Sequence, residues 1–156
     1  MPFFLKPVGV GVLLSVLLLG CSKQEKEVPQ PEPVPAVTSL TLTTLTPTAG
    51  ATLTRASTLT AQLAYSLAAT ETSPYGYRVA IQFAKVNSTT TTAINPSSIN
   101  LTERTGTVTL QYPLELIWDR TNLALAHPIT CYYYLQRVNA TNSTVIAKTA
   151  AQSFTE

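Results

Sequence analysis

The amino-acid sequence predicts an all-β domain of about seven antiparallel strands that form a sandwich. Three observations favour this fold class. Apolar side chains alternate with small or polar ones along most of the chain after residue 37, which is the period of a half-buried strand. Threonine is abundant, with 26 residues, and it suits pleated strands better than helices. Turn-forming clusters separate the alternating segments, and none of these segments has the apolar spacing of a long amphipathic helix.

The clearest strand covers residues 57–68, where Leu59, Leu63 and Leu67 alternate with small or polar residues. Such a strand turns one face to the core and the other to water. The same alternation occurs in residues 77–83, where Val79 and Ile81 are apolar. The other predicted strands cover residues 38–46, 77–83, 108–112, 129–138 and 144–154.

The last predicted strand, residues 144–154, has an ambiguous inward face. A regular alternation that keeps Lys148 and Gln152 in water also leaves Ile146 and Phe154 outside the core. A β-bulge adds one residue to a strand and exchanges its two faces beyond that point. A bulge in this segment would reconcile the two demands.

Turn-forming residues stand between these strands, as expected for short loops rather than long helical connections. They are Pro47–Gly50, Ser73–Pro74, Asn95–Ser98, Thr105–Gly106, His127–Pro128 and Asn139–Ser143.

About seven strands within 120 residues resemble an immunoglobulin-like or fibronectin-type-III-like domain. The Cys, Trp, Cys signature of true immunoglobulin domains is absent. The resemblance implies that the third, sixth and seventh strands share one sheet. The outer face of this sheet would then carry Arg78, Gln82, Tyr132, Tyr134, Gln136, Lys148 and Gln152.

An apolar run over residues 8–19 follows Lys6. It is shorter than the about 20 residues of a membrane-spanning helix, and it fits the hydrophobic region of a secretory signal peptide. Leu18-Leu19-Gly20-Cys21 follows directly and resembles the lipobox of bacterial lipoproteins. The resemblance implies cleavage before Cys21 and attachment of lipid to its thiol, and so a membrane partner. The alternative is an ordinary signal peptide with an accidental cysteine.

The next segment is poor in large apolar residues, and four prolines alternate with other residues from Pro29 to Pro35. Such a composition favours an extended, solvated stalk with a reach of about 45 Å. Residues 22–27 resemble the charged export signals of surface lipoproteins from Bacteroidota, although charges also simply keep a stalk solvated. The predicted organisation is a signal peptide (1–20), a lipidated cysteine and stalk (21–36) and one β-sandwich domain (37–156).

Charge is sparse in the predicted domain, with seven Lys or Arg residues and five Asp or Glu residues. There is no basic run, so nucleic acid is not an expected partner. If Cys21 carries lipid, Cys131 has no disulfide partner in the chain. Because Cys131 lies in an apolar segment, we expect it in the core, and the alternative is a reactive or intermolecular thiol.

Residues with catalytic potential are few. His127 is the only histidine, and we expect it in a surface loop before Pro128. The acids Glu71, Glu103, Glu115, Asp119 and Glu156 show no spacing that selects a catalytic pair. The sequence therefore predicts no catalytic residue, no metal site and no cofactor.

A binding function has modest support from the predicted outer face, because tyrosine mixed with arginine is typical of recognition surfaces. Candidate ligand contacts are Arg78, Tyr132, Tyr134 and Trp118. Exposed tyrosines can also simply favour strand formation, and a lone tryptophan often closes one end of a core. Two hypotheses follow. The first is a lipid-anchored protein of the bacterial envelope, on the outer membrane, that binds an envelope protein or glycan without catalysis. The second is a carbohydrate-binding accessory module, and an enzyme ranks third.

Overall fold

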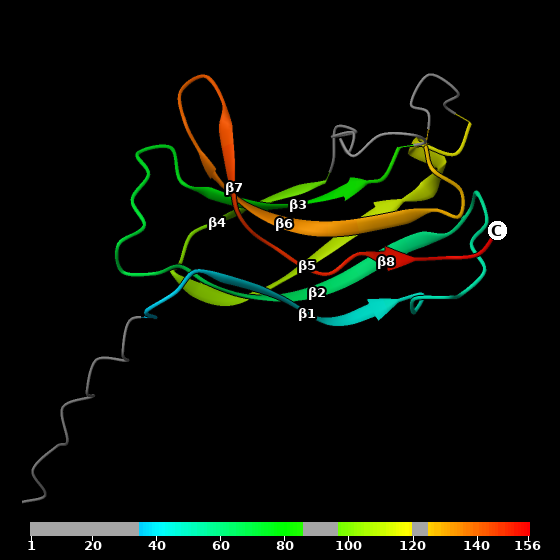
Figure 1. Cartoon of the computed structure of the whole chain (residues 1–156), viewed down its shortest axis with the longest axis horizontal. Coiled ribbons are helices and arrows are strands. Elements are labelled where there is room, and N and C mark those ends of the chain that lie inside the picture. The colour runs from blue at the N-terminus through cyan, green and yellow to red at the C-terminus, as the bar shows by residue number, and fades with distance from the viewer. Residues whose placement is uncertain (1–34, 86–96, 120–124) are drawn as a thin grey trace, which may run out of the picture. The chain divides into compact units, whose positions relative to one another are not determined.

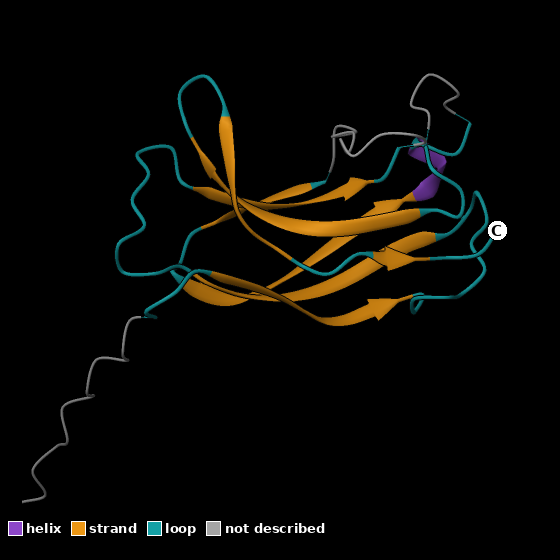
Figure 2. Ribbon diagram, in the orientation of Figure 1, coloured by secondary structure: helices purple, strands orange, loops and turns teal. Residues whose placement is uncertain are grey.

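The predicted β-sandwich is confirmed by a computed structural model, which describes residues 35–85, 97–119 and 125–156. Two antiparallel sheets lie face to face (Figure 2). The predicted signal peptide, Cys21 and nearly all of the predicted stalk lie outside the described residues. Among the residues that are described, no helix is long and apolar enough to cross a membrane.

The first sheet has three strands in the order β1-β2-β5, and all neighbours are antiparallel. Its strands are β1 (Ser39–Thr46), β2 (Thr58–Ser66) and β5 (Thr105–Pro113). The pairing of β1 with β2 shifts register at Thr43, whose hydroxyl donates to the carbonyl oxygen of Gln62 at 2.9 Å. This irregularity lets β1 keep leucines against the core on both sides of Thr43.

The second sheet has the order β4-β3-β6-β7, and a short strand β8 also pairs with β6 (Figure 1). Its strands are β3 (Tyr77–Phe83), β4 (Ser98–Leu101), β6 (Thr130–Val138), β7 (Ser143–Lys148) and β8 (Gln152–Ser153). The three segments predicted to share a sheet therefore do so.

The core lies between the two sheets and follows the predicted alternation. Leu59 and Leu63 of β2 are fully buried, as are Val79 and Ile81 of β3. The ring centroids of Phe83 in β3 and Tyr112 in β5 are 5.0 Å apart, so aromatic packing joins the two sheets. The other fully or nearly fully buried members include Leu53, Leu67, Leu110, Leu114, Ile117, Ile129, Cys131, Tyr133, Leu135 and Phe154.

Two local predictions are wrong. Ser98 does not end a turn but begins β4, which pairs with β3. Four residues are too few to show a clear alternation, so the sequence does not predict this strand.

Thr105–Gly106 is not a turn but the start of β5, where Gly106 lies opposite Tyr65. A Cβ atom on Gly106 would lie 3.2 Å from the Tyr65 hydroxyl oxygen, so the missing side chain makes room for the tyrosine ring.

A bulge does reconcile the ambiguous alternation near the C-terminus. Leu135 of β6 pairs with Ala147 and Gln136 pairs with Val145, so Ile146 is the extra residue. Ile146 thereby reaches the core. A second irregularity separates β7 from β8, and Phe154 beyond it is buried. The bulge and the break between β7 and β8 therefore allow both Ile146 and Phe154 to pack against the core.

Cys131 lies in the core, as predicted, with no exposed surface. Burial raises the pKa of its thiol to about 12. Burial, with a smaller effect from Cys131, also raises the pKa of the neighbouring Tyr133 phenol. Both groups stay protonated in the folded protein well above the pH at which an exposed thiol ionises.

Cys131 should make folding stability depend on alkaline pH. Above about pH 9 the thiol ionises in the unfolded chain but not in the folded one, so stability falls as pH rises. The expected loss is up to about 1.4 kcal/mol per pH unit until the folded thiol also ionises. Urea denaturation between pH 7 and 11 measures this loss.

The matched variant is Cys131→Ala, which removes the titrating group. Its free energy of unfolding should fall less steeply with pH than that of the wild type, even if it is lower throughout. Parallel curves for the two proteins would contradict the assignment.

Candidate functional site

The candidate site is the outer face of the five-stranded sheet, centred on β6. We call it the tyrosine face. Pairing across the strands sets Tyr132 opposite Gln82, Gln136 opposite Arg78 and Tyr134 opposite Lys148. Directly opposed residues point to the same side of a sheet. The polar side chains of the tyrosine face are therefore Arg78, Gln82, Tyr132, Tyr134, Gln136 and Lys148, together with Ser143 opposite Val138. The apolar Val145, opposite Gln136, lies beside them.

Side chains at the centre of this face are more buried than the sequence suggested. Tyr134 is only 5% exposed and Gln136 only 6%, whereas Tyr132 is half-buried. β6 has a paired neighbour on each side, so side chains from β3 and β7 flank its outward residues. The face is thus a packed layer of polar and aromatic groups rather than a set of freely exposed side chains.

Arg78 is held by neutral partners on this face. The carboxamide oxygen of Gln136 accepts hydrogen bonds from Nε and from Nη2 of Arg78. The Nη2 group also donates to the Ser143 hydroxyl at 3.3 Å. Gln136 thereby satisfies its buried oxygen, and the guanidinium group is fixed in one orientation. Ser143 was not a predicted site residue, because it stood in a predicted turn.

The two tyrosines form the middle of the face. The Tyr132 hydroxyl donates to Oε1 of Gln82 at 2.6 Å, and the two tyrosine rings meet edge to face with centroids 6.3 Å apart. Nζ of Lys148 lies 5.8 Å from the centroid of the Tyr132 ring, within cation–π range. Burial raises the pKa of Tyr134, partly offset by the charge of Arg78. Its hydroxyl is therefore protonated at neutral pH and can donate a hydrogen bond.

Gln152 was predicted on this face, but the structure places it elsewhere. It pairs with Cys131, whose side chain points into the core. The irregular segment between β7 and β8 exchanges the two faces of the strand, so Gln152 points inward. There it lines a pocket of about 410 Å³ together with Leu40 and Leu42 of β1.

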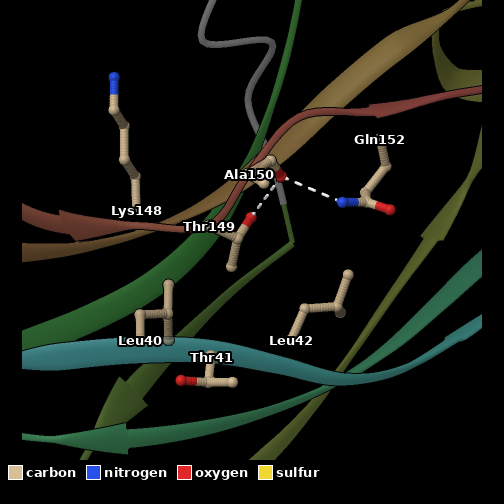
Figure 3. Close-up of a pocket in the computed structure, with 7 residues that line it drawn as sticks. All are labelled: Leu40, Thr41, Leu42, Lys148, Thr149, Ala150 and Gln152. Atoms are coloured by element: carbon tan, nitrogen blue, oxygen red, sulfur yellow. Dashed lines mark hydrogen bonds between the residues drawn. The ribbon is translucent and has the colours of Figure 1, made fainter.

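The pocket lies between the β1 edge and the segment that joins β7 to β8 (Figure 3). Leu40 and Leu42 point from β1 toward this segment. The carbonyl oxygen of Ala150 accepts from Oγ1 of Thr149 at 3.0 Å and from Nε2 of Gln152 at 3.2 Å. Two of the polar side chains that line the pocket, Thr149 and Gln152, therefore donate to the same carbonyl group.

Trp118 follows a short 3-10 helix, η1 (Leu114–Leu116), and packs against the core. Its backbone nitrogen donates to the carbonyl oxygen of Leu114 at 2.9 Å. It therefore contributes to the core, and the structure does not bring it together with the two tyrosines. This location favours the interpretation of Trp118 as a residue that closes one end of the core.

His127 lies on the surface, as predicted, with Nδ1 at 2.7 Å from both carboxylate oxygens of Glu156. Glu156 also accepts from the backbone nitrogen of Ile129 at 3.2 Å, so this pair fastens the C-terminal residues to β6. Elsewhere Arg55 pairs with Asp119 on the surface. Within the described part of the chain, no three or more His, Cys, Asp or Glu side chains group as metal ligands would.

No protein family model, curated protein or solved structure matches this chain. The residues around Cys21 and the geometry of the tyrosine face are therefore the observations from which a function can be proposed.

We expect Gln136 to stabilise the folded protein by accepting hydrogen bonds from Arg78. Gln136→Leu keeps a similar volume but removes the acceptor of two guanidinium hydrogen bonds, which leaves a half-buried charge poorly solvated. The free energy of unfolding should fall by about 1–3 kcal/mol in urea denaturation. Gln111→Leu, on the exposed side of β5, is the matched control and should change it by less than about 0.5 kcal/mol. Equal losses in the two variants would show that Gln136 does not hold Arg78.

Proposed function

We propose that this chain is a lipid-anchored protein of the bacterial envelope, on the outer membrane, and that its β-sandwich is a non-catalytic binding, adhesion or scaffolding module. The observation that carries the anchor is Leu18-Leu19-Gly20-Cys21, directly after an apolar run of signal-peptide length. Two or more acyl chains on Cys21 would give stable attachment, because each buried methylene contributes about 0.8 kcal/mol. The proline-rich stalk would hold the sandwich away from the membrane surface.

The proposed binding role has support from the tyrosine face. Arg78 is fixed by two neutral side chains, Gln136 and Ser143, and Tyr132 is fixed by Gln82. Side chains fixed before binding lose little conformational entropy when a ligand arrives. Such a face suits recognition of a partner in the envelope, either a protein or a glycan.

The second candidate function is a carbohydrate-binding accessory module that works beside a separate hydrolase. The composition of the tyrosine face favours it, since planar polar groups from Arg78 and Gln136 lie on the same face of the sheet as two tyrosine rings. Trp118 lends it no support, because its side chain packs against the core.

The proposed lipid anchor predicts that labelling with a palmitate analogue depends on Cys21. Cells that express the full chain and grow with an alkyne analogue of palmitate should label the wild-type protein. Cys21→Ser should lose the label and leave the membrane fraction, because the thioether needs the thiol. Cys131→Ser is the matched control and should keep both the label and the membrane location. A Cys21→Ser protein that stays labelled in the membrane fraction would overturn the proposed anchor.

A further inference from the structure

The tyrosine face carries positive charge without a matching negative charge. Arg78 and Lys148 are its two ionised side chains. Three of the five described acids contact basic side chains elsewhere: Glu71 with Arg137, Asp119 with Arg55 and Glu156 with His127. In the part of the chain that the structure describes, no carboxylate pairs with Arg78 or Lys148. The face is therefore electrostatically complementary to an anion.

The guanidinium group of Arg78 has donors to spare. Its Nε and Nη2 groups bond to Gln136 and Ser143, while Nη1 has no hydrogen-bond partner among the described residues. Gln136 and Ser143 are uncharged, so they orient the guanidinium group without cancelling its charge. An anion that approaches the face meets a fixed cation with two free N–H groups.

Tyr134 adds a third donor beside the two cations. The residue is only 5% exposed, but its hydroxyl is not among the buried side-chain atoms that lack a hydrogen-bond partner. No described residue bonds to this hydroxyl. Tyr134 lies directly opposite Lys148, and it interacts electrostatically with Arg78. The hydroxyl is thus a surface donor with a positive charge on either side of it.

The backbone of β6 takes no part in this face. β6 pairs with β3 on one side and with β7 and β8 on the other. An extended peptide usually binds by adding a strand to an unpaired sheet edge. The edges of this sheet are β4 and β7, whereas Arg78 and the two tyrosines lie on β3 and β6 between them. The donors of the tyrosine face are all side chains, at the spacing of neighbouring strands, beside the half-buried ring of Tyr132. This arrangement suits a saccharide, whose hydroxyl and carboxylate groups project from a compact ring.

We propose that the tyrosine face binds a saccharide that bears a carboxylate, with the carboxylate on Arg78 Nη1 and the Tyr134 hydroxyl and with Lys148 attracting it. This assignment rests on the proposed function of the sandwich as a non-catalytic binding module, and it names the ligand class of that module.

The test uses the full chain purified in detergent and three acidic probes: oligogalacturonate, oligoalginate and sialyllactose. Each probe is paired with its methyl ester, which has the same ring and hydroxyls but no charge. Isothermal titration calorimetry should show at least one acid that binds about tenfold more tightly than its ester. The affinity should fall as salt rises, because part of the attraction is electrostatic.

Single variants locate the site. Arg78→Gln should weaken binding of the acid about tenfold or more, and Arg78→Lys should not restore it, since lysine lacks the planar fork of donors. Tyr134→Phe removes one surface hydroxyl and should weaken binding about threefold or more without changing the melting temperature. Lys148→Gln should also weaken binding. Lys85→Gln, the same change two residues beyond the C-terminal end of β3, should leave it unaltered.

Four results would overturn the proposal: no saturable binding of any acidic probe, equal binding of an acid and its ester, full binding by the well-folded Tyr134→Phe protein, or tighter binding of polyglutamate or anionic lipid vesicles than of the saccharides. These results do not depend on lipid attachment. If no acidic saccharide binds but palmitate labelling depends on Cys21, the proposed ligand class is wrong and the proposed anchor stands. If a saccharide binds as expected but labelling does not depend on Cys21, the ligand class stands and the proposed anchor is wrong.

Discussion

The alternation of side chains along β6 is the constraint on which the rest of the structure depends. Cys131, Tyr133 and Leu135 point into the core, while Tyr132 and Tyr134 point outward. Because β6 pairs on both sides, a slip of one residue would exchange these two sets. Such a slip would bury the polar outer groups and expose the centre of the core. The register that builds the core therefore also builds the tyrosine face.

This constraint explains why the C-terminal segment is irregular. β7 and β8 must both pair with β6, and the segment must also bring Ile146 and Phe154 to the core. A regular strand cannot do this. The bulge at Ile146 and the break between β7 and β8 change which residues face the core, so both side chains can pack there. The break also turns Gln152 inward and leaves the pocket beside β1. That pocket is thus a consequence of how the segment packs against the core, and Thr149 and Gln152 within it both donate to the carbonyl group of Ala150.

The domain has few charged side chains, and several of them make specific contacts that hold parts of the fold together. Glu156 and His127 fasten the C-terminal residues to the surface beside β6. Glu71 lies 3.5 Å from Arg137 at the end of the sandwich. Arg78 differs, because only neutral groups hold it. A cation that the fold orients but does not neutralise is the feature that connects this architecture to the proposed recognition of an anionic ligand. If Cys21 carries lipid, that recognition would take place at a membrane.

The sequence by itself determined the features that depend on local alternation: the fold class, six of the strands, the inward residues of β2, β3 and β6, the burial of Cys131 and the conflict between the two faces of the last strand. These follow from the period of two, which needs no knowledge of neighbouring strands. Only the tertiary structure decided the rest. β4 is too short to show a period, and the place of Gly106 in a strand depends on the Tyr65 ring beside it. For the candidate site, the sequence predicted Arg78, Tyr132 and Tyr134 on one face. It could not predict that Tyr134 is nearly buried, that Gln136 and Ser143 fix Arg78 or that Trp118 joins the core. Those facts depend on which strands lie side by side and how their side chains cover one another, and both are set by contacts between residues far apart in the chain.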